Sequence, residues 1–155
     1  MISIRDLSKR YDDNTVLKDI NLNVPKHTVT AMIGPSGSGK TTLLRLIDLL
    51  EEPTSGEIVF DGVDTSTSEK ARLEMRRRMV IVFQKPVVFS GSVYDNVAYG
   101  LKIRGQGRRP VREKVLHALE TVDLSGYENR RARTLSGGEV QRVALARAMV
   151  TDPEL

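Results

Sequence analysis

The stretch IGPSGSGKTT at residues 33–42 constrains the fold of this chain more than any other part of its sequence. The fixed positions of the pattern G-x-x-x-x-G-K-[ST], which describes a phosphate-binding loop, are occupied by Gly34, Gly39, Lys40 and Thr41. The apolar run at 29–33 predicts a buried strand before the loop, and the leucine-rich segment 43–50 predicts a helix after it. This order of elements predicts an α/β fold that binds phosphate groups.

The residue types of this loop indicate how it would bind phosphate. Glycines let the backbone turn its N–H groups inward, and the following helix presents its N-terminus to the same anion. Lys40 supplies a positive charge for the β- and γ-phosphates, and the Thr41 hydroxyl is placed to bind Mg²⁺. The other expected loop residues are Pro35, Ser36, Gly37, Ser38 and Thr42. A simple glycine-rich turn before a helix is the alternative, and the match at every fixed position argues against it.

Composition limits the other classes of function. The chain has 155 residues, the length of about one domain, and no cysteine, which excludes disulfides and thiolate metal sites. The net charge of +4 is small, and the arginine clusters lack interleaved aromatic residues, so solvated helix faces are favoured over a nucleic-acid surface. No apolar run reaches the roughly 18 residues of a membrane span. The N-terminus has an alternating strand pattern instead of a signal peptide, so we expect a cytoplasmic protein.

The segments flanking the loop predict further elements of an α/β domain. Residues 1–33 predict β-structure, and 57–62 predict a strand that ends in an Asp-Gly hairpin turn. That turn argues against Asp61 as a magnesium ligand. A polar helix is predicted to run from a cap within 65–68 to about Arg78.

Gln84 follows the β-prone run 79–83, which predicts a buried strand. In open α/β sheets, ligands bind at the carboxyl ends of the strands, so Gln84 is a candidate for contact with Mg²⁺ or the attacking water. A simple polar strand terminator is the alternative.

From residue 90 the sequence predicts helices. Ser92 is a candidate N-cap, residues 105–107 break the first helix, and Pro110 lies in the first turn of the next. Ser136 is predicted to cap a third helix, and the two glycines after it expose backbone N–H groups. The N-terminus of that helix is a second candidate anion site.

Together these motifs resemble the ATP-binding-cassette (ABC) ATPases, the nucleotide-binding subunits of transporters. Residues 34–42 resemble the Walker A motif, Gln84 in VFQKP resembles the Q-loop, and LSGGEVQRVALARAM at 135–149 resembles the family signature. Tyr11 matches the aromatic residue that stacks on adenine, and Val16 matches its apolar neighbour. The resemblance covers the whole chain.

The resemblance implies a P-loop NTPase (RecA-like) core with an N-terminal antiparallel β subdomain and an inserted α-helical subdomain. Residues 1–84 would form the ATP-binding core with the β subdomain, 85–134 the helical subdomain, and 135–150 the signature and its helix. The Walker B strand, the catalytic glutamate, the D-loop and the switch histidine have no counterpart up to Leu155. We therefore expect one incomplete domain with weak nucleotide binding and little or no hydrolysis.

The resemblance also implies the ligands and partners. ATP and Mg²⁺ would be shared between two subunits in a head-to-tail dimer, with these signature residues facing the nucleotide of the other copy: Ser136, Gly137, Gly138 and Glu139. Glutamine is more usual than Glu139 at its position. Gln84 would couple the metal site to integral membrane permease subunits, which place the chain on the cytoplasmic face of the membrane, with an extracytoplasmic solute-binding protein as an indirect partner.

The type of transport is a further expectation from the resemblance. Residues 85–101 are similar to importer ATPases, most of all to the phosphate, tungstate or molybdate oxyanion group. One alternative is a soluble ABC ATPase in translation or DNA repair. The other is a basic nucleic-acid-binding domain that happens to carry a phosphate-binding loop.

Overall fold

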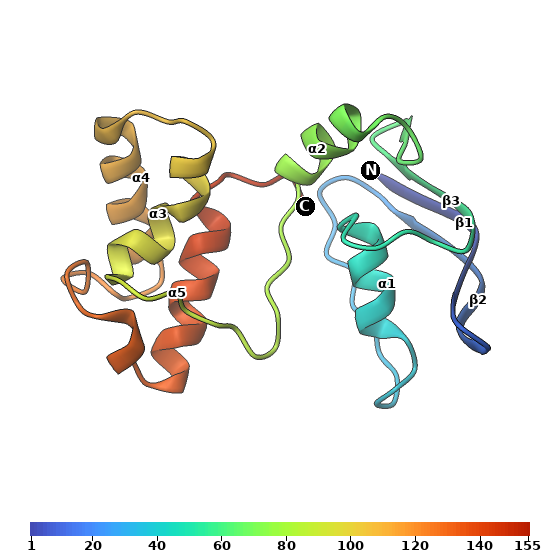
Figure 1. Cartoon of the computed structure of the whole chain (residues 1–155), viewed down its shortest axis with the longest axis horizontal. Coiled ribbons are helices and arrows are strands. Elements are labelled where there is room, and N and C mark those ends of the chain that lie inside the picture. The colour runs from blue at the N-terminus through green and yellow to red at the C-terminus, as the bar shows by residue number, and fades with distance from the viewer. The chain divides into compact units, whose positions relative to one another are not determined.

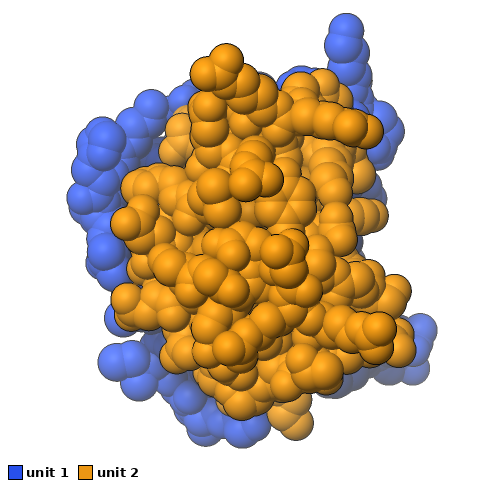
Figure 2. Space-filling model, turned by 90° about the vertical axis from the view of Figure 1, so that its left-hand side faces the viewer, with its two compact units in different colours: residues 1–81 blue, residues 82–155 orange.

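The computed structural model describes residues 1–155, and the chain divides into two compact units, residues 1–81 and residues 82–155. Figure 2 shows the first unit in blue and the second in orange. The first unit contains the strands and the helices α1 and α2, and the second contains α3, α4 and α5 (Figure 1). The boundaries expected at residues 84 and 134 remain predictions.

A four-stranded antiparallel sheet with the order β2-β1-β3-β4 forms the framework of the first unit. Its strands are β1 (Ile2–Tyr11), β2 (Asn14–Val24), β3 (Ser55–Phe60) and β4 (Val63–Asp64). Asp61 and Gly62 have positive φ angles of 54° and 84° and join β3 to β4 in the predicted hairpin turn. The Asp61 carboxylate pairs with Lys26 at 2.6 Å and with Arg78 at 2.8 Å.

Helix α1 (Lys40–Ile47) buries Leu43 and Leu46 in a core shared with the inward-facing residues of the sheet. The core residues of the first unit are Ile2, Ile4, Leu7, Leu17, Leu43, Leu46, Leu49, Ile58, Phe60, Met75 and Met79. Helix α2 (Glu69–Arg77) contributes Met75 and begins at the predicted cap, because the Ser68 Oγ accepts a hydrogen bond from the Ala71 N–H. The predicted helices after the loop and after residue 68 are therefore confirmed.

Gly56 is the second residue of β3 and lies where the register with β1 shifts between Arg5 and Ser8. Its φ angle is +85°, and a Cβ atom there would lie 2.4 Å from the Asp6 carbonyl oxygen. Because this neighbour is backbone, only glycine fits at this position. Strict alternation after Ile2 and Ile4 would place Asp6 in the core. Because the register shifts between Ile4 and Leu7, Leu7 is buried there instead.

Two sequence predictions for this part of the chain are wrong. Residues 29–33 and 79–83 form no strand, and no strand of the chain pairs with either segment. Val29 and Ile33 are almost fully exposed, and Phe83 is 43% exposed. Apolar residues give a segment strand propensity, but a strand also requires a neighbour that satisfies its backbone N–H and C=O groups. Residues 29–33 and 79–83 have no such neighbour within residues 1–155.

Three helices form the framework of the second unit: α3 (Val93–Ile103), α4 (Arg108–Thr121) and α5 (Gly137–Met149). A short 3₁₀ helix spans Ala132–Thr134. The helices pack side by side around an apolar core (Figure 1). The fully buried large residues of this core are Val93, Val97, Leu101, Val115, Leu119 and Leu124. The predicted helices and the break at residues 105–107 are confirmed, and none of the helices combines the length and apolarity needed to cross a bilayer.

Candidate functional site

The glycine loop is positioned by close packing of Gly39 against β2. Gly39 is buried, has a φ angle of +85° and is the N-cap of α1. A Cβ atom at this residue would lie 2.7 Å from the Leu17 Cδ2 and 3.1 Å from the Val16 carbonyl oxygen. The left-handed backbone and the lack of space both require glycine. The end of the loop and the start of α1 are thereby fixed against the sheet.

Lys40 folds its ammonium group back over the loop. Its Nζ donates hydrogen bonds to the carbonyl oxygens of Gly34 at 2.7 Å and Pro35 at 2.6 Å, and lies 3.2 Å from the Ser38 Oγ. The positive charge is therefore held against the loop by neutral acceptors. Anionic oxygens accept stronger hydrogen bonds than neutral carbonyls, so a phosphate can replace these acceptors.

The N-terminus of α1 has no capping side chain. Gly39 precedes the helix, so the first backbone N–H groups of α1 have no side-chain acceptor. Thr41 lies in this first turn and is exposed. At Gly34, an added Cβ would lie 3.0 Å from the Ser38 Oγ and 3.9 Å from the Lys40 Nζ, so a side chain there would intrude on the loop. These residues fit a bound phosphate chain.

Tyr11 and Val16 lie in the same unit as the glycine loop. Tyr11 ends β1, is 41% exposed and donates its phenolic hydrogen bond to the Glu51 carboxylate. This hydrogen bond raises the pKa of the Tyr11 phenol and lowers the pKa of the Glu51 carboxyl. Val16 is half-buried on β2 beside Gly39. Sequence reasoning did not identify Glu51, because an acidic residue in a polar turn carries no signal of a distant partner.

The signature segment begins α5 with a reciprocal capping box. The Ser136 Oγ accepts a hydrogen bond from the Glu139 N–H at 3.4 Å, and the Glu139 carboxylate accepts the Ser136 N–H at 2.7 Å. The Ser136 hydroxyl also donates to this carboxylate at 2.8 Å. The hydrogen bond from the Ser136 backbone is the main cause of the lowered pKa of Glu139. The predicted cap is confirmed, whereas the part played by Glu139 was not predicted.

We expect the stabilising effect of Glu139 to depend on pH. Its pKa is lowered in the folded state, so its contribution is complete above its ordinary value of 4.5 and is lost as the pH falls through the folded-state pKa. Urea unfolding of the native chain and of Glu139→Ala measures this contribution. The two proteins should differ in stability at neutral pH and converge in acid.

Glu120→Ala is the matched control for this test, because Glu120 is an exposed carboxylate on a neighbouring helix, 3.9 Å from His117. Its effect should be smaller than that of Glu139→Ala at neutral pH. A stability difference between the native chain and Glu139→Ala that does not shrink in acid would contradict the proposed cause.

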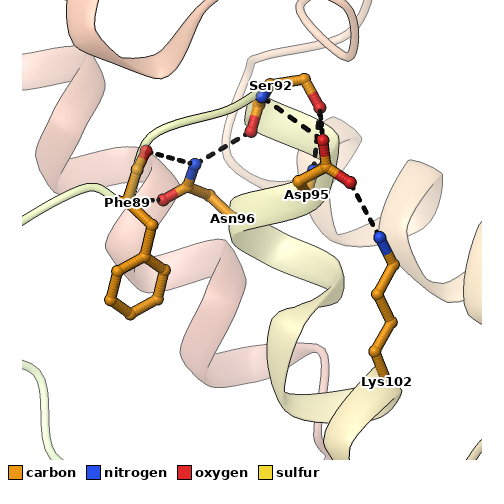
Figure 3. A network of polar contacts seen from close by, with 5 residues as sticks. All are labelled: Phe89, Ser92, Asp95, Asn96 and Lys102. Carbon is orange, nitrogen blue, oxygen red and sulfur yellow. Dashed lines mark hydrogen bonds and ion pairs between the residues drawn. The ribbon is translucent and has the colours of Figure 1, made fainter.

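Gln84 is exposed and lies in the irregular segment that precedes α3. Farther along this segment, Phe89 is held by Asn96, which is completely buried on α3 (Figure 3). The Asn96 Oδ1 accepts the Phe89 N–H at 2.7 Å, and its Nδ2 donates to the carbonyl oxygens of Phe89 at 3.1 Å and Ser92 at 2.9 Å. Ser92 and Asp95 form the capping box of α3 beside it.

Arg147 joins the same segment to α5. Its Nη2 donates a hydrogen bond to the Val87 carbonyl oxygen at 2.8 Å, and its guanidinium lies 4.9 Å from the centre of the Phe89 ring. Its Nη1 is buried without a hydrogen-bond partner. Burial lowers the pKa of the Arg147 guanidinium. The helix that carries the signature is therefore tied directly to the segment that follows Gln84.

The structure thus places the predicted site residues in two groups. Tyr11, Val16 and the loop 34–42 lie in the first unit, whereas Gln84 and residues 136–139 lie in the second. No group of three or more histidine, cysteine, aspartate or glutamate side chains could hold a metal ion.

Comparison with known sequences identifies related proteins. The sequence profile described as ABC transporter matches residues 17–155. The Fe(3+) ions import ATP-binding protein of Escherichia coli K12 is 42% identical over 155 residues, covering 99% of this chain and 43% of that protein. The spermidine/putrescine import ATP-binding protein of Acetivibrio thermocellus is 45% identical over 156 residues, covering 100% of this chain and 43% of that protein. The chain thus spans less than half the length of these curated relatives.

Solved structures of ABC cassettes match almost the whole chain. CbiO1 of Clostridium perfringens, part of the ABC transporter complex CbiONQ, matches 98% of this chain and 62% of its own, with 33% identity and a TM-score of 0.87. A dimeric bacterial ABC transporter cassette matches 99% of this chain and 71% of its own, with 32% identity and a TM-score of 0.89. These matches confirm the predicted fold class. The family profile over residues 17–155 and the matches to solved cassettes, together with the glycine loop and the capped helix α5, show that this chain belongs to the ABC transporter family and matches its ATP-binding domain.

Proposed function

We propose that this chain carries the ATP-binding site of an ATPase subunit that powers the import of a solute across a membrane. The observation that carries the proposal is the glycine loop at the uncapped start of α1, with the Lys40 ammonium folded over it. Two relatives named as import ATP-binding proteins, 42% and 45% identical, favour import over a soluble role in translation or DNA repair.

The glycine loop, Tyr11, Val16 and Gln84 have distinct roles in this proposal. The backbone of residues 34–42 and the Lys40 ammonium bind the phosphate chain. The Tyr11 ring stacks on adenine, with Val16 beside it. Thr41 and Gln84 are the proposed ligands of Mg²⁺, which when bound neutralises charge on the phosphates. Gln84 also orients the attacking water.

The second unit supplies the other half of a shared site in a dimer of two ATPase subunits. Residues 136–139 face the nucleotide held by the glycine loop of the other subunit. The N-terminus of α5 presents backbone N–H groups to this anion, and the capping box fixes the Ser136 side chain in place. A related cassette was solved as a dimer, which supports this arrangement.

The chemical class of the transported solute is not part of this proposal. The named relatives import Fe(3+) ions or spermidine and putrescine, so they give no support to the oxyanion group suggested by residues 85–101. The proposal is therefore limited to solute import. Permease subunits in the membrane are the proposed partners of the helical part of the chain, on the cytoplasmic face.

Replacing Ser136 by arginine tests the shared site. In a full-length version of the subunit, the variant should bind Mg²⁺-ATP with nearly the native affinity, because Ser136 lies outside the glycine loop. It should lose the ATP-dependent dimer, because a long cationic side chain blocks the approach of the second subunit. Light scattering after size-exclusion chromatography with saturating Mg²⁺-ATP measures the dimer.

Ser125→Arg provides the matched control, since Ser125 is an exposed serine of the same unit outside the signature. In the same full-length version, this variant should dimerise like the native subunit. Dimerisation of Ser136→Arg to the same extent as the native protein would contradict the proposed role of the signature. A loss of ATP affinity in the isolated subunit as large as the loss of dimerisation would also contradict it.

A further inference from the structure

A cluster of charged side chains holds the ring of Tyr11. The Glu51 carboxylate accepts the Tyr11 phenolic hydrogen bond, and it also lies 3.7 Å from the Lys9 Nζ and 3.4 Å from the Arg45 Nη1. The Glu51 side chain is 23% exposed, so it is partly shielded from water. Glu51 is thus the common partner of a strand residue, an aromatic ring and a helix residue.

This cluster links the ring to the helix that begins at the phosphate-binding loop. Arg45 lies on α1, whose first residue is Lys40. Glu51 therefore connects the C-terminal half of α1 to Tyr11, which ends β1. A nucleotide that binds its phosphates at the start of α1 and stacks its base on Tyr11 requires a fixed separation between these two points.

We propose that Glu51 is a positioning residue for the nucleobase, which holds the Tyr11 ring at a set place relative to the phosphate-binding helix α1. The inference rests on the proposed function. Without this hydrogen bond, Tyr11 at an exposed strand end would change rotamer, and a bound base would have to order it again. Fixing the ring in advance removes that entropic cost of binding.

Lys9 determines which face of the ring receives the base. Its ammonium lies 4.8 Å from the centre of the Tyr11 ring and donates a hydrogen bond to the Glu52 carbonyl oxygen at 2.8 Å. The Lys9 side chain is only 15% exposed, so it remains in this place. One face of the ring is covered by the cation, and the base stacks on the opposite face.

Four variants of the full 155-residue chain test this role: Tyr11→Phe, Glu51→Ala, Glu51→Gln and the double variant Tyr11→Phe/Glu51→Ala. The probes are Mg²⁺-ATP and Mg²⁺-tripolyphosphate, whose dissociation constants are measured by calorimetry. Tripolyphosphate has no base, so its binding does not depend on Tyr11. Tyr11→Phe keeps the stacking ring and removes only the hydroxyl.

We expect Tyr11→Phe and Glu51→Ala each to weaken ATP binding about three- to tenfold, as the cost of ordering one side chain on binding predicts. Tripolyphosphate affinity should not change. The double variant should be no weaker than either single variant, because both remove the same contact. Glu51→Gln should recover part of the loss, since its amide oxygen accepts a hydrogen bond. Glu52→Ala, which removes a neighbouring carboxylate paired with Arg72, should bind ATP like the native chain.

The outcomes separate this inference from the function on which it rests. If the native chain binds both probes and the ATP affinities of Tyr11→Phe and Glu51→Ala are unchanged, the role of Glu51 is overturned and the proposed function is not. Equal losses for both probes would overturn it too, since they indicate general damage to the first unit. A native chain that binds neither probe would overturn the proposed function itself.

Discussion

Replacing Lys40 by alanine is expected to weaken Mg²⁺-ATP binding by about 100-fold, because hydrogen bonds to charged groups contribute about 1.5–3 kcal/mol. The native ammonium already lies over the loop, within 2.7 Å of the Gly34 and Pro35 carbonyl oxygens. It therefore exchanges neutral acceptors for phosphate oxygens without a large movement. Titration with a fluorescent ATP analogue, with unlabelled ATP as competitor, measures the change.

The controls for this prediction separate charge from geometry. Lys18→Ala removes an exposed lysine from β2 and should leave the affinity unchanged. Lys40→Arg keeps the charge but places a planar group in a loop shaped for a compact ammonium, so most of the affinity should be lost. Native-like ATP binding by Lys40→Ala would show that the loop does not bind phosphate through this residue.

Replacing Asn96 by alanine is expected to destabilise the second unit by about 3 kcal/mol, since a typical net hydrogen bond contributes about 1 kcal/mol and buried unsatisfied groups cost more. The Asn96 side chain makes hydrogen bonds to the N–H and C=O of Phe89 and to the C=O of Ser92. Urea unfolding, followed by the circular dichroism signal of the helices, measures this loss of stability.

Hydrogen exchange adds a second, local readout. The Phe89 amide donates to Asn96 at 2.7 Å, so it should exchange much faster in Asn96→Ala. Asn129→Ala, which removes an exposed asparagine of the same unit, should change neither stability nor exchange. A Phe89 amide that stays protected in Asn96→Ala would show that another contact holds this segment.

The elements predicted correctly are those with local signals. Ser92 with the apolar spacing of α3 predicted that helix, and Asp61-Gly62 predicted the turn between β3 and β4. Residues 29–33 carry an equally strong apolar signal but form no strand. Strand formation depends on a partner elsewhere in the fold, which local propensity does not contain.

The same distinction applies to the site. The loop around Lys40 and the cap at Ser136 follow from residue types at fixed spacing. Glu51 and Arg147 were not predicted, because their partners Tyr11 and Val87 are 40 and 60 residues away in sequence. A single acidic residue or a single arginine contains no information about such a distant contact.

The contact between Arg147 and Val87 has a mechanical consequence. Arg147 is on α5, which begins at the signature, and Val87 is three residues beyond Gln84. A helix transmits displacement along its length because its backbone hydrogen bonds keep it stiff. A displacement of α5 along its axis would therefore pull on the Val87 carbonyl, which belongs to the same irregular segment as Gln84.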